Sequence, residues 1–152
     1  MKKLLLMIDE LEKHSINYEK TNPTISNATV GWQIAHSLKV INTIINALKL
    51  SNPTTYKWKF NKVRFIFMLI GVFPRGKAKA PKAVQPSEDI TIEGLKENIE
   101  KVRSKLNDWE SIDENAYFPH PYFGDLNKKT TLKFLGLHTN HHLKIIRDIV
   151  RN

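Results

Sequence analysis

Residues 132–147 read Leu-Lys-Phe-Leu-Gly-Leu-His-Thr-Asn-His-His-Leu-Lys-Ile-Ile-Arg and contain three of the six histidines in the chain. His138 and His142 are four residues apart, so on an α-helix both rings project from one face, with Cα atoms about 6 Å apart along the axis. The same face continues as a seam with alternating spacings of three and four, formed by Leu135, His138, His142, Ile145 and Ile149. The stretch therefore predicts a core-facing helix in which two imidazoles take the place of leucines.

A third metal ligand is expected from the helix predicted over residues 29–50. His36 lies on the apolar face of that helix, which steps at intervals of four through Trp32, His36, Val40, Ile44 and Leu48. A lone histidine on such a face is more often a hydrogen-bonded core residue than a ligand. Together with the pair on the last helix, however, it predicts a site for one metal ion formed by His36, His138 and His142. The chain has no cysteine, so a metal would have to be bound by histidine and carboxylate.

Four segments carry the helical period of apolar residues: 2–19, 29–50, 92–109 and the segment that follows Asn127, its predicted N-cap. No alternating strand pattern and no internal repeat is present. We therefore predict an all-α fold, an antiparallel four-helix bundle, in a single domain of residues 1–152. The irregular part of this bundle is the long connection between the second and third core helices, within which residues 56–70 are either helical or partly extended.

The apolar stretches are too short to cross a membrane. The first, Leu4–Ile8, has five residues, where the apolar region of a signal peptide needs at least about seven. The longest other run, Phe65–Phe73, has nine residues, where a spanning helix needs about twenty. We expect no transmembrane segment and, since the absence of cysteine fits a reducing compartment, a cytoplasmic protein.

The formal net charge of +9 is concentrated in one segment. Between Lys57 and Lys82 the chain has eight basic residues and no acidic residue: Lys57, Lys59, Lys62, Arg64, Arg75, Lys77, Lys79 and Lys82. This distribution does not favour a nucleic-acid recognition helix. The mixture of cations and aromatic residues is found in segments that bind membrane surfaces or single strands, and also in helices whose lysines extend over buried rings. In a third alternative, an anionic substrate enters between this segment and the metal site, and Arg75 is the candidate residue that contacts it.

The stretch 117–124 is dense in aromatic residues and prolines and is predicted to be a loop. Within it, His120 lies between two prolines. It is either a catalytic proton donor or substrate contact above the metal site, or a packing residue that bonds to backbone. Tyr122 is a candidate substrate contact beside it. His141 lies about 100° around the helix from His142, so we expect it next to the ligands or on the surface.

Three neutral imidazoles leave a metal ion with its full charge and at least one open position. Such an ion can lower the pKa of bound water to about 7 or bind a thiolate, so hydrolysis and thiol transfer are both chemically feasible. No acidic residue stands out as the general base. Two non-enzymatic alternatives remain: a binding module that uses the basic segment for nucleic acid or an anionic membrane surface, and a scaffold in which the histidines only bridge helices.

Several motifs resemble a known superfamily. Trp-x-x-x-His ending at His36 and His-x-x-x-His ending at His142 are similar to the DinB-like (YfiT-like) superfamily of metal-dependent hydrolases. Phe-Pro-Arg-Gly at 73–76, His-Pro-Tyr-Phe-Gly at 120–124 and the sequence 136–143 resemble, more narrowly, a subfamily known as a domain of unknown function. The likeness covers nearly the whole chain in order.

The resemblance implies a four-helix bundle, frequently dimeric, with zinc or nickel bound by His36, His138 and His142 and with Trp32 next to these ligands. It also implies action on a small-molecule substrate, in some relatives with a low-molecular-weight thiol as the second substrate. Many relatives have glutamine three residues after the last ligand, where this chain has Ile145.

Overall fold

The computed structural model describes residues 1–71, 73, 81–86 and 89–151. Short 3-10 helices are labelled η. The elements in chain order are α1 (Lys2–His14), η1 (Ser15–Asn17), α2 (Val30–Leu50), η2 (Pro53–Thr55), α3 (Lys62–Ile70), η3 (Lys82–Val84), α4 (Ile92–Asn107), η4 (Trp109–Ser111), β1 (Tyr117–His120), β2 (Gly124–Asn127) and α5 (Lys128–Arg151).

The prediction of an all-α four-helix bundle is wrong. The described residues form five α-helices and a two-stranded antiparallel sheet, so the fold is mixed α and β. β1 and the turn lie in the stretch 117–124 that was predicted as a loop, and β2 continues to Asn127, with Tyr117 paired to Asn127 and His120 to Gly124. Pro119 concealed this strand, because proline lacks the N–H that a central strand needs and is tolerated only where one edge is free. The backbone of Gly124 has φ +67°, a left-handed conformation that allows the tight turn.

The described residues contain one α-helix more than the four predicted. This helix, α3, begins later than the start of the segment 56–70 that the sequence left open. Residues 56–60 are not helical, and α3 starts at Lys62 after Asn61, whose side-chain oxygen accepts a hydrogen bond from the backbone N–H of Arg64 at 2.8 Å. The helix ends at Ile70, and the following residue, Gly71, has φ +70°. The first helix is likewise shorter than predicted, because η1 follows α1 from Ser15.

Side-chain caps fix the start of the helices that carry the histidines. The hydroxyl of Thr29 accepts a hydrogen bond from the backbone N–H of Trp32 at 3.0 Å at the start of α2. The side-chain oxygen of Asn127 accepts one from the N–H of Thr130 at 3.1 Å at the start of α5. Asn127 is the cap that the sequence predicted, and Thr29 is the first residue of the predicted segment 29–50. Each cap satisfies a backbone N–H in the first turn, which would otherwise lack an acceptor within the helix.

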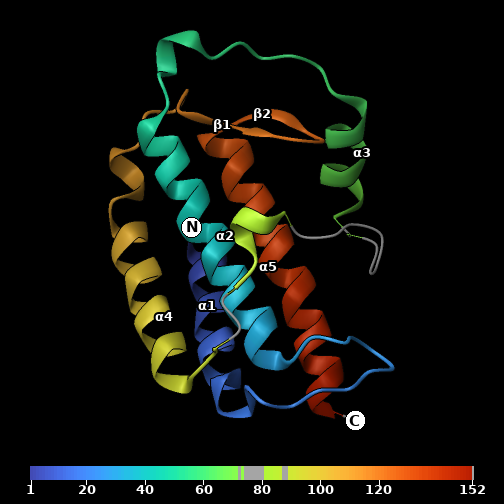
Figure 1. Cartoon of the computed structure of the whole chain (residues 1–152). Helices are drawn as coiled ribbons and strands as arrows, with labels where there is room; N and C mark the ends of the chain where they lie inside the picture. Colours follow the sequence, from blue (N-terminus) through green and yellow to red (C-terminus); the bar gives the residue numbers. More distant parts are fainter. Residues whose placement is uncertain (72, 74–80, 87–88, 152) are drawn as a thin grey trace.

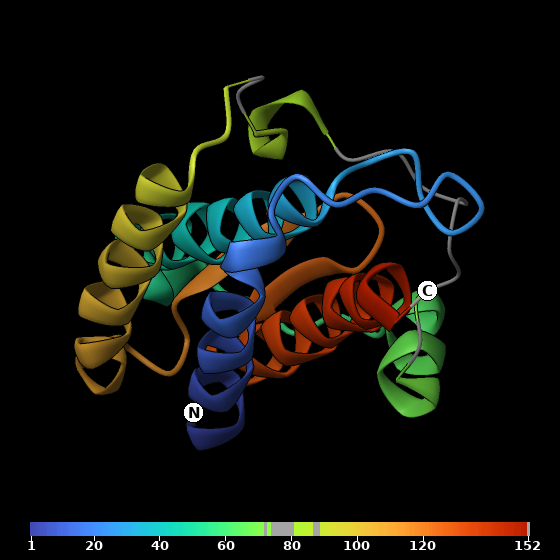
Figure 2. The same ribbon diagram turned by 90° about the horizontal axis from the view of Figure 1, so that it is seen from below.

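Four long helices pack around the main core, with α2 in contact with both α4 and α5, and α1 in contact with the same two helices (Figures 1 and 2). The centre of this core is aliphatic, and its fully buried side chains include Ile8, Leu11, Ile34, Ile41, Leu95, Ile99, Leu135 and Leu143. Ion pairs join the helices at the periphery. Arg147 of α5 donates to both carboxylate oxygens of Glu10 in α1 at 2.6 and 2.7 Å.

The hairpin and α3 lie together at one end of the molecule (Figure 1). Arg64 of α3 is buried and donates hydrogen bonds to the backbone carbonyls of Phe123 and Asp125 at 3.2 and 3.1 Å, and to that of Lys59. The short helix is therefore attached to the hairpin by a buried guanidinium.

Among the described residues, none of the helices combines the length and the apolar character needed to cross a membrane.

Candidate metal centre

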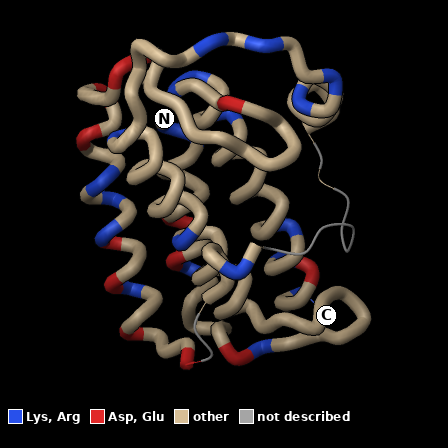
Figure 3. The backbone as a smooth tube through the Cα atoms, turned by 45° about the horizontal axis from the view of Figure 1, so that its top comes forward, with Lys and Arg blue, Asp and Glu red and all other residues tan. Residues whose placement is uncertain are grey.

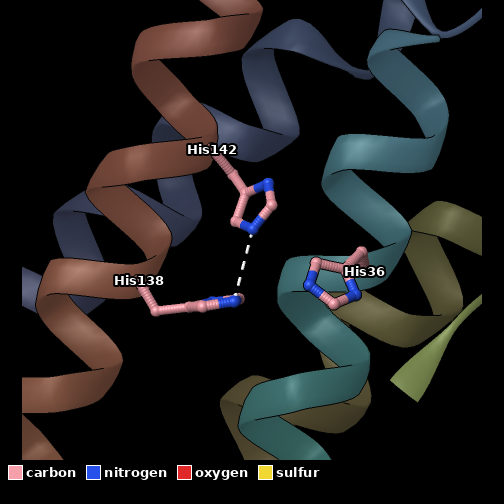
Figure 4. A group of neighbouring side chains, drawn as sticks. All are labelled: His36, His138 and His142. Atoms are coloured by element: carbon pink, nitrogen blue, oxygen red, sulfur yellow. Dashed lines mark hydrogen bonds between the residues drawn. The ribbon is translucent and has the colours of Figure 1, made fainter. Parts of the chain in front are cut away.

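His36 of α2 faces His138 and His142 of α5 across the contact between these two helices (Figure 4). Each of the three residues offers one ring nitrogen, and these nitrogens all lie within 4.8 Å of one another. The ring centroids are 4.7 Å apart for His36 and His142 and 5.2 Å apart for His36 and His138. The sequence predicted that these three side chains come together, and the structure shows that they do. Their role as metal ligands stays a prediction.

The backbone around His36 determines which of its ring nitrogens is available. Its Nδ1 lies 2.8 Å from the carbonyl oxygen of Val84 in η3. A carbonyl can only accept a hydrogen bond, so Nδ1 must carry the proton and donate it. The lone pair is therefore left on Nε2, which is the arrangement found in metal-binding histidines whose other ring nitrogen donates to a backbone carbonyl.

Gln33 determines the proton position of His142 in the same way. The side-chain amide nitrogen of Gln33 donates to the hydroxyl of Ser26 at 3.1 Å, so its oxygen faces His142, whose Nδ1 lies 2.6 Å away. Nδ1 of His142 is then the donor, and Nε2 keeps its lone pair. Gln33 is 3% exposed and His142 is 7% exposed, so this hydrogen bond is shielded from water.

His138 has a different environment. Its Nε2 lies 3.3 Å from Nε2 of His142, whereas its Nδ1 is buried without a hydrogen-bond partner in the described part of the chain. Two nitrogens bound to one tetrahedral zinc ion at about 2.0–2.1 Å are about 3.3 Å apart. The separation of His138 and His142 therefore fits a shared cation, and the donor set of neutral imidazoles suits a divalent transition metal.

Burial keeps these three side chains in the neutral form that binds metal. Removal from water lowers the pKa of His36, and it lowers the pKa values of His138 and His142 well below the ordinary value. The imidazoles also lower one another's pKa, because each charge would repel the next. At neutral pH the site presents lone pairs to a cation and carries no charge of its own.

Two further predicted residues lie directly beside the three histidines. The indole of Trp32 stacks on the ring of His36, with centroids 4.9 Å apart and an angle of 15° between the planes. The ring of His141 lies edge-on to that of His142 at 5.1 Å. These contacts restrict the rotation of His36 and His142.

His120 lies on β1, outside the three-histidine cluster. Its ring stacks on Phe123 at 4.3 Å and meets Phe134 at 4.9 Å, and its Nδ1 accepts hydrogen bonds from the N–H groups of Tyr122 and Phe123, both at 3.2 Å. Burial lowers the pKa of His120 to about 4. The bonds at Nδ1 are those expected of a packing residue bonded to backbone. A catalytic role of His120 stays a prediction.

Of the two candidate substrate contacts, Tyr122 is not brought to the cluster. Tyr122 is 66% exposed. The rings of Tyr122, His120, Phe134 and His138 follow one another at 6.2, 4.9 and 5.7 Å, so two rings separate Tyr122 from the cluster. Arg75 lies outside the described residues.

The sequence interpretation missed Gln33 and Val84. Gln33 had a detectable signal, because a polar residue one helical turn before His36 on a buried face needs a partner. Val84 acts through its backbone carbonyl, which no side-chain pattern reveals. In the described part of the chain, no carboxylate belongs to the cluster of possible ligands.

Comparison with known proteins gives a family for this chain. Residues 63–149 match a family described as protein of unknown function (DUF1569), which is more than half of the chain. The chain belongs to the DUF1569 family. The matched region of this DUF1569 protein begins at Val63 and includes His120, His138 and His142, whereas His36 precedes it.

A curated relative of this DUF1569 protein is the uncharacterized protein YuaE of Bacillus subtilis (strain 168), which is 30% identical over 78 residues. The match covers 48% of each chain, so this chain spans about half the length of the curated relative it matches. No solved structure matches the chain significantly.

Proposed function

We propose that this DUF1569 protein is a metal-dependent enzyme acting on a small molecule, with one divalent ion bound by Nε2 of His36, His138 and His142. One observation carries the proposal. Nδ1 of His36 and of His142 is engaged by an acceptor, Val84 O and Gln33 Oε1 respectively, so both rings direct their lone pairs from opposite helices toward the same place. Histidines kept only for packing have no need of such matched orientation.

The chemistry follows from the ligands. An ion bound by three neutral imidazoles keeps its charge and an open position, and supplies either an activated water or a bound thiolate. We therefore propose a hydrolase or a thiol-dependent transferase, with zinc or nickel as the metal. The likeness of the histidine motifs to the DinB-like superfamily supports this choice, and a low-molecular-weight thiol and a homodimer belong to the same proposal. The DUF1569 family is described as of unknown function, so membership of it does not indicate an activity.

The residues of the chain have separate tasks in this proposal. Val84 and Gln33 hold the rings of His36 and His142 in the binding tautomer, and Trp32 keeps His36 in place by stacking. The aliphatic core around α2 and α5 excludes water from the protein side of the site. The oriented, desolvated nitrogens reduce the free energy needed to assemble the site when metal arrives.

Metal analysis of untagged protein tests the proposal, because a histidine tag would bind metal itself. We expect about one zinc or nickel ion per chain in the parent protein. His36→Ala should lose the metal, whereas the matched control His14→Gln, which changes a histidine of α1 outside the cluster, should retain it. A parent protein with little metal, or a His36→Ala variant with unchanged metal, contradicts the proposal. Metal retained without activity on thiol-transfer and ester or amide substrates supports the scaffold alternative.

A further inference from the structure

The outward face of α3 is apolar, which is the reverse of an ordinary surface helix. At 100° per residue, its exposed side chains occupy an arc of roughly 160°. They are Lys62, Val63, Phe65, Ile66, Leu69 and Ile70, and the two last are 74% and 64% exposed. Only Arg64, Phe67 and Met68 on the other side are buried or partly buried. Large exposed aliphatic residues gathered in this way are typical of a surface that meets a partner.

The extended segment before α3 adds aromatic residues to the same region. Trp58 and Phe60 are 66% and 61% exposed, and their rings are 6.5 Å apart. Phe60 also lies 6.1 Å from Phe65 of α3, so the aromatic residues are continuous with the helix. We call this surface, formed by Trp58, Phe60, Val63, Phe65, Ile66, Leu69 and Ile70, the α3 face.

The α3 face is held in a defined position. The guanidinium of Arg64 donates to the carbonyls of Phe123 and Asp125 in the hairpin and to that of Lys59. The side-chain amide of Asn61 donates to the carbonyl of Tyr122 at 3.1 Å. These bonds orient α3 so that its apolar residues point away from the hairpin. The exposure of these apolar residues therefore follows from the way α3 is bonded to the hairpin.

The charges around the α3 face are positive. Lys57, Lys59 and Lys62 are exposed, and the sequence from 57 to 70 contains no acidic residue. Figure 3 shows basic positions along the segment that runs into α3. In the neighbouring strands, the acidic residue is Asp125 of β2. An occupant of the face must therefore combine apolar groups with negative charge.

A groove next to α3 is also lined by apolar and basic residues. A Cβ at Gly71, which follows α3, would lie 3.5 Å from Cδ2 of Leu137 in α5, so the end of α3 is close to this side chain. Leu137 also lines a groove between α1 and α5, together with Leu4, Met7 and the three lysines Lys3, Lys129 and Lys133. All three lysines are exposed. The combination of apolar and basic residues thus continues beyond α3.

The apolar and basic residues of the α3 face could be covered by a second copy of the chain, by nucleic acid or by an anionic lipid surface, and they favour one of the three. A second copy would bring the same lysines, on a chain of net charge +9, against the first, so like charges would meet. Nucleic acid would neutralise the lysines, but its interfaces are polar and provide no partner for Leu69 and Ile70. An anionic lipid surface offers both negative headgroups for the lysines and an acyl region for the aliphatic residues.

We infer that the α3 face binds reversibly to membranes that contain anionic lipids, with the apolar side chains inserted at the level of the headgroups and Lys57, Lys59 and Lys62 in contact with phosphates. This is peripheral attachment through one short helix and its aromatic flank. It is independent of the metal site, which is formed by α2 and α5.

Co-sedimentation of the full chain with vesicles tests the inference. We expect binding to vesicles of phosphatidylcholine mixed with phosphatidylglycerol, weaker binding as salt is raised, and little binding to phosphatidylcholine alone. Leu69→Gln with Ile70→Gln should reduce the partition coefficient by at least about tenfold, because two apolar side chains no longer enter the lipid. Replacing Lys57, Lys59 and Lys62 by glutamine should reduce it about fivefold for each lysine.

Matched controls use exposed residues of the same type on other elements. Leu6→Gln with Leu50→Gln, on α1 and α2, and glutamine at Lys96, Lys101 and Lys144 should leave binding unchanged. No binding to anionic vesicles at low salt, equal binding to neutral vesicles, or equal losses in the controls would overturn the inference. So would a vesicle-independent dimer that is abolished by Leu69→Gln with Ile70→Gln, or an oligonucleotide that binds the face while vesicles do not.

Discussion

Gln33 accepts a hydrogen bond from Nδ1 of His142 at 2.6 Å, from one helix of the main core to another. Gln33 is itself oriented by Ser26, to which its amide donates. Ser26 in turn accepts a hydrogen bond from the backbone N–H of Ala28 at 3.1 Å. This chain connects the segment before α2 to the candidate metal ligand on α5, so the loop contributes to the orientation of His142.

Gln33→Leu removes the acceptor while keeping a side chain of similar size. We expect metal affinity to fall 10- to 100-fold, because the tautomer and orientation of His142 are no longer fixed. Competition between the protein and a chromophoric chelator measures this affinity. Gln33→Glu keeps an acceptor at the same place and should restore most of it. Equal affinity in Gln33→Leu and the parent protein would show that the hydrogen bond does not position the ligand.

Arg64→Ala should destabilise the attachment of α3 to the hairpin. The substitution leaves the carbonyls of Lys59, Phe123 and Asp125 without their donor, at a cost of about 1–3 kcal/mol in the free energy of unfolding. Urea denaturation measures the loss, and hydrogen exchange should show faster exchange in α3. Lys62→Ala, on the exposed side of the same helix, should change stability by less than about 0.5 kcal/mol. If the two variants are equally stable, the guanidinium is not the attachment.

His120 should titrate far below an ordinary histidine. Burial lowers its pKa to about 4 in the folded chain, against about 6.5 when unfolded. The unfolded state therefore binds more protons between these values, so the stability from the neutral ring is present above pH 6.5 and is lost as the pH falls toward 4. Histidine NMR measures the titration and should also show the proton on Nε2. A titration near pH 6.5 would contradict the buried, backbone-bonded position.

The ion pair between Arg147 and Glu10 should stabilise the fold only when Glu10 is ionised. Its hydrogen bonds with Arg147 lower the pKa of Glu10, so the contribution is present above the unfolded pKa of about 4.5 and is lost as the pH falls through the lower folded value. Arg147→Met should therefore cost up to about 1 kcal/mol at pH 7, and less in strong acid. Arg151→Met, on the exposed last turn of α5, is the control. A cost that is independent of pH would instead indicate lost packing.

Helical periodicity gave the positions of the four long helices and the approach of His36 to His138 and His142, because burial of one face fixes each helix in rotation. The hairpin was missed because Pro119 interrupts the strand pattern and its four-residue strands are too short to show a period. The start of α3 was missed because residues 56–70 are apolar and basic all round, so no face was identifiable. The contact of Val84 with His36 was not predicted, because Val84 acts through its backbone carbonyl and its position next to His36 depends on tertiary structure.

The central claim is that Nε2 of His36, His138 and His142 bind one metal ion. An anomalous difference map from crystals of the untagged protein, collected at the absorption edge of the metal found by elemental analysis, tests it most directly. We predict one peak about 2.0–2.1 Å from the three Nε2 atoms if the metal is zinc, with Val84 and Gln33 still bonded to the Nδ1 atoms. A peak elsewhere, bonds through Nδ1, or no peak between α2 and α5 would contradict the account.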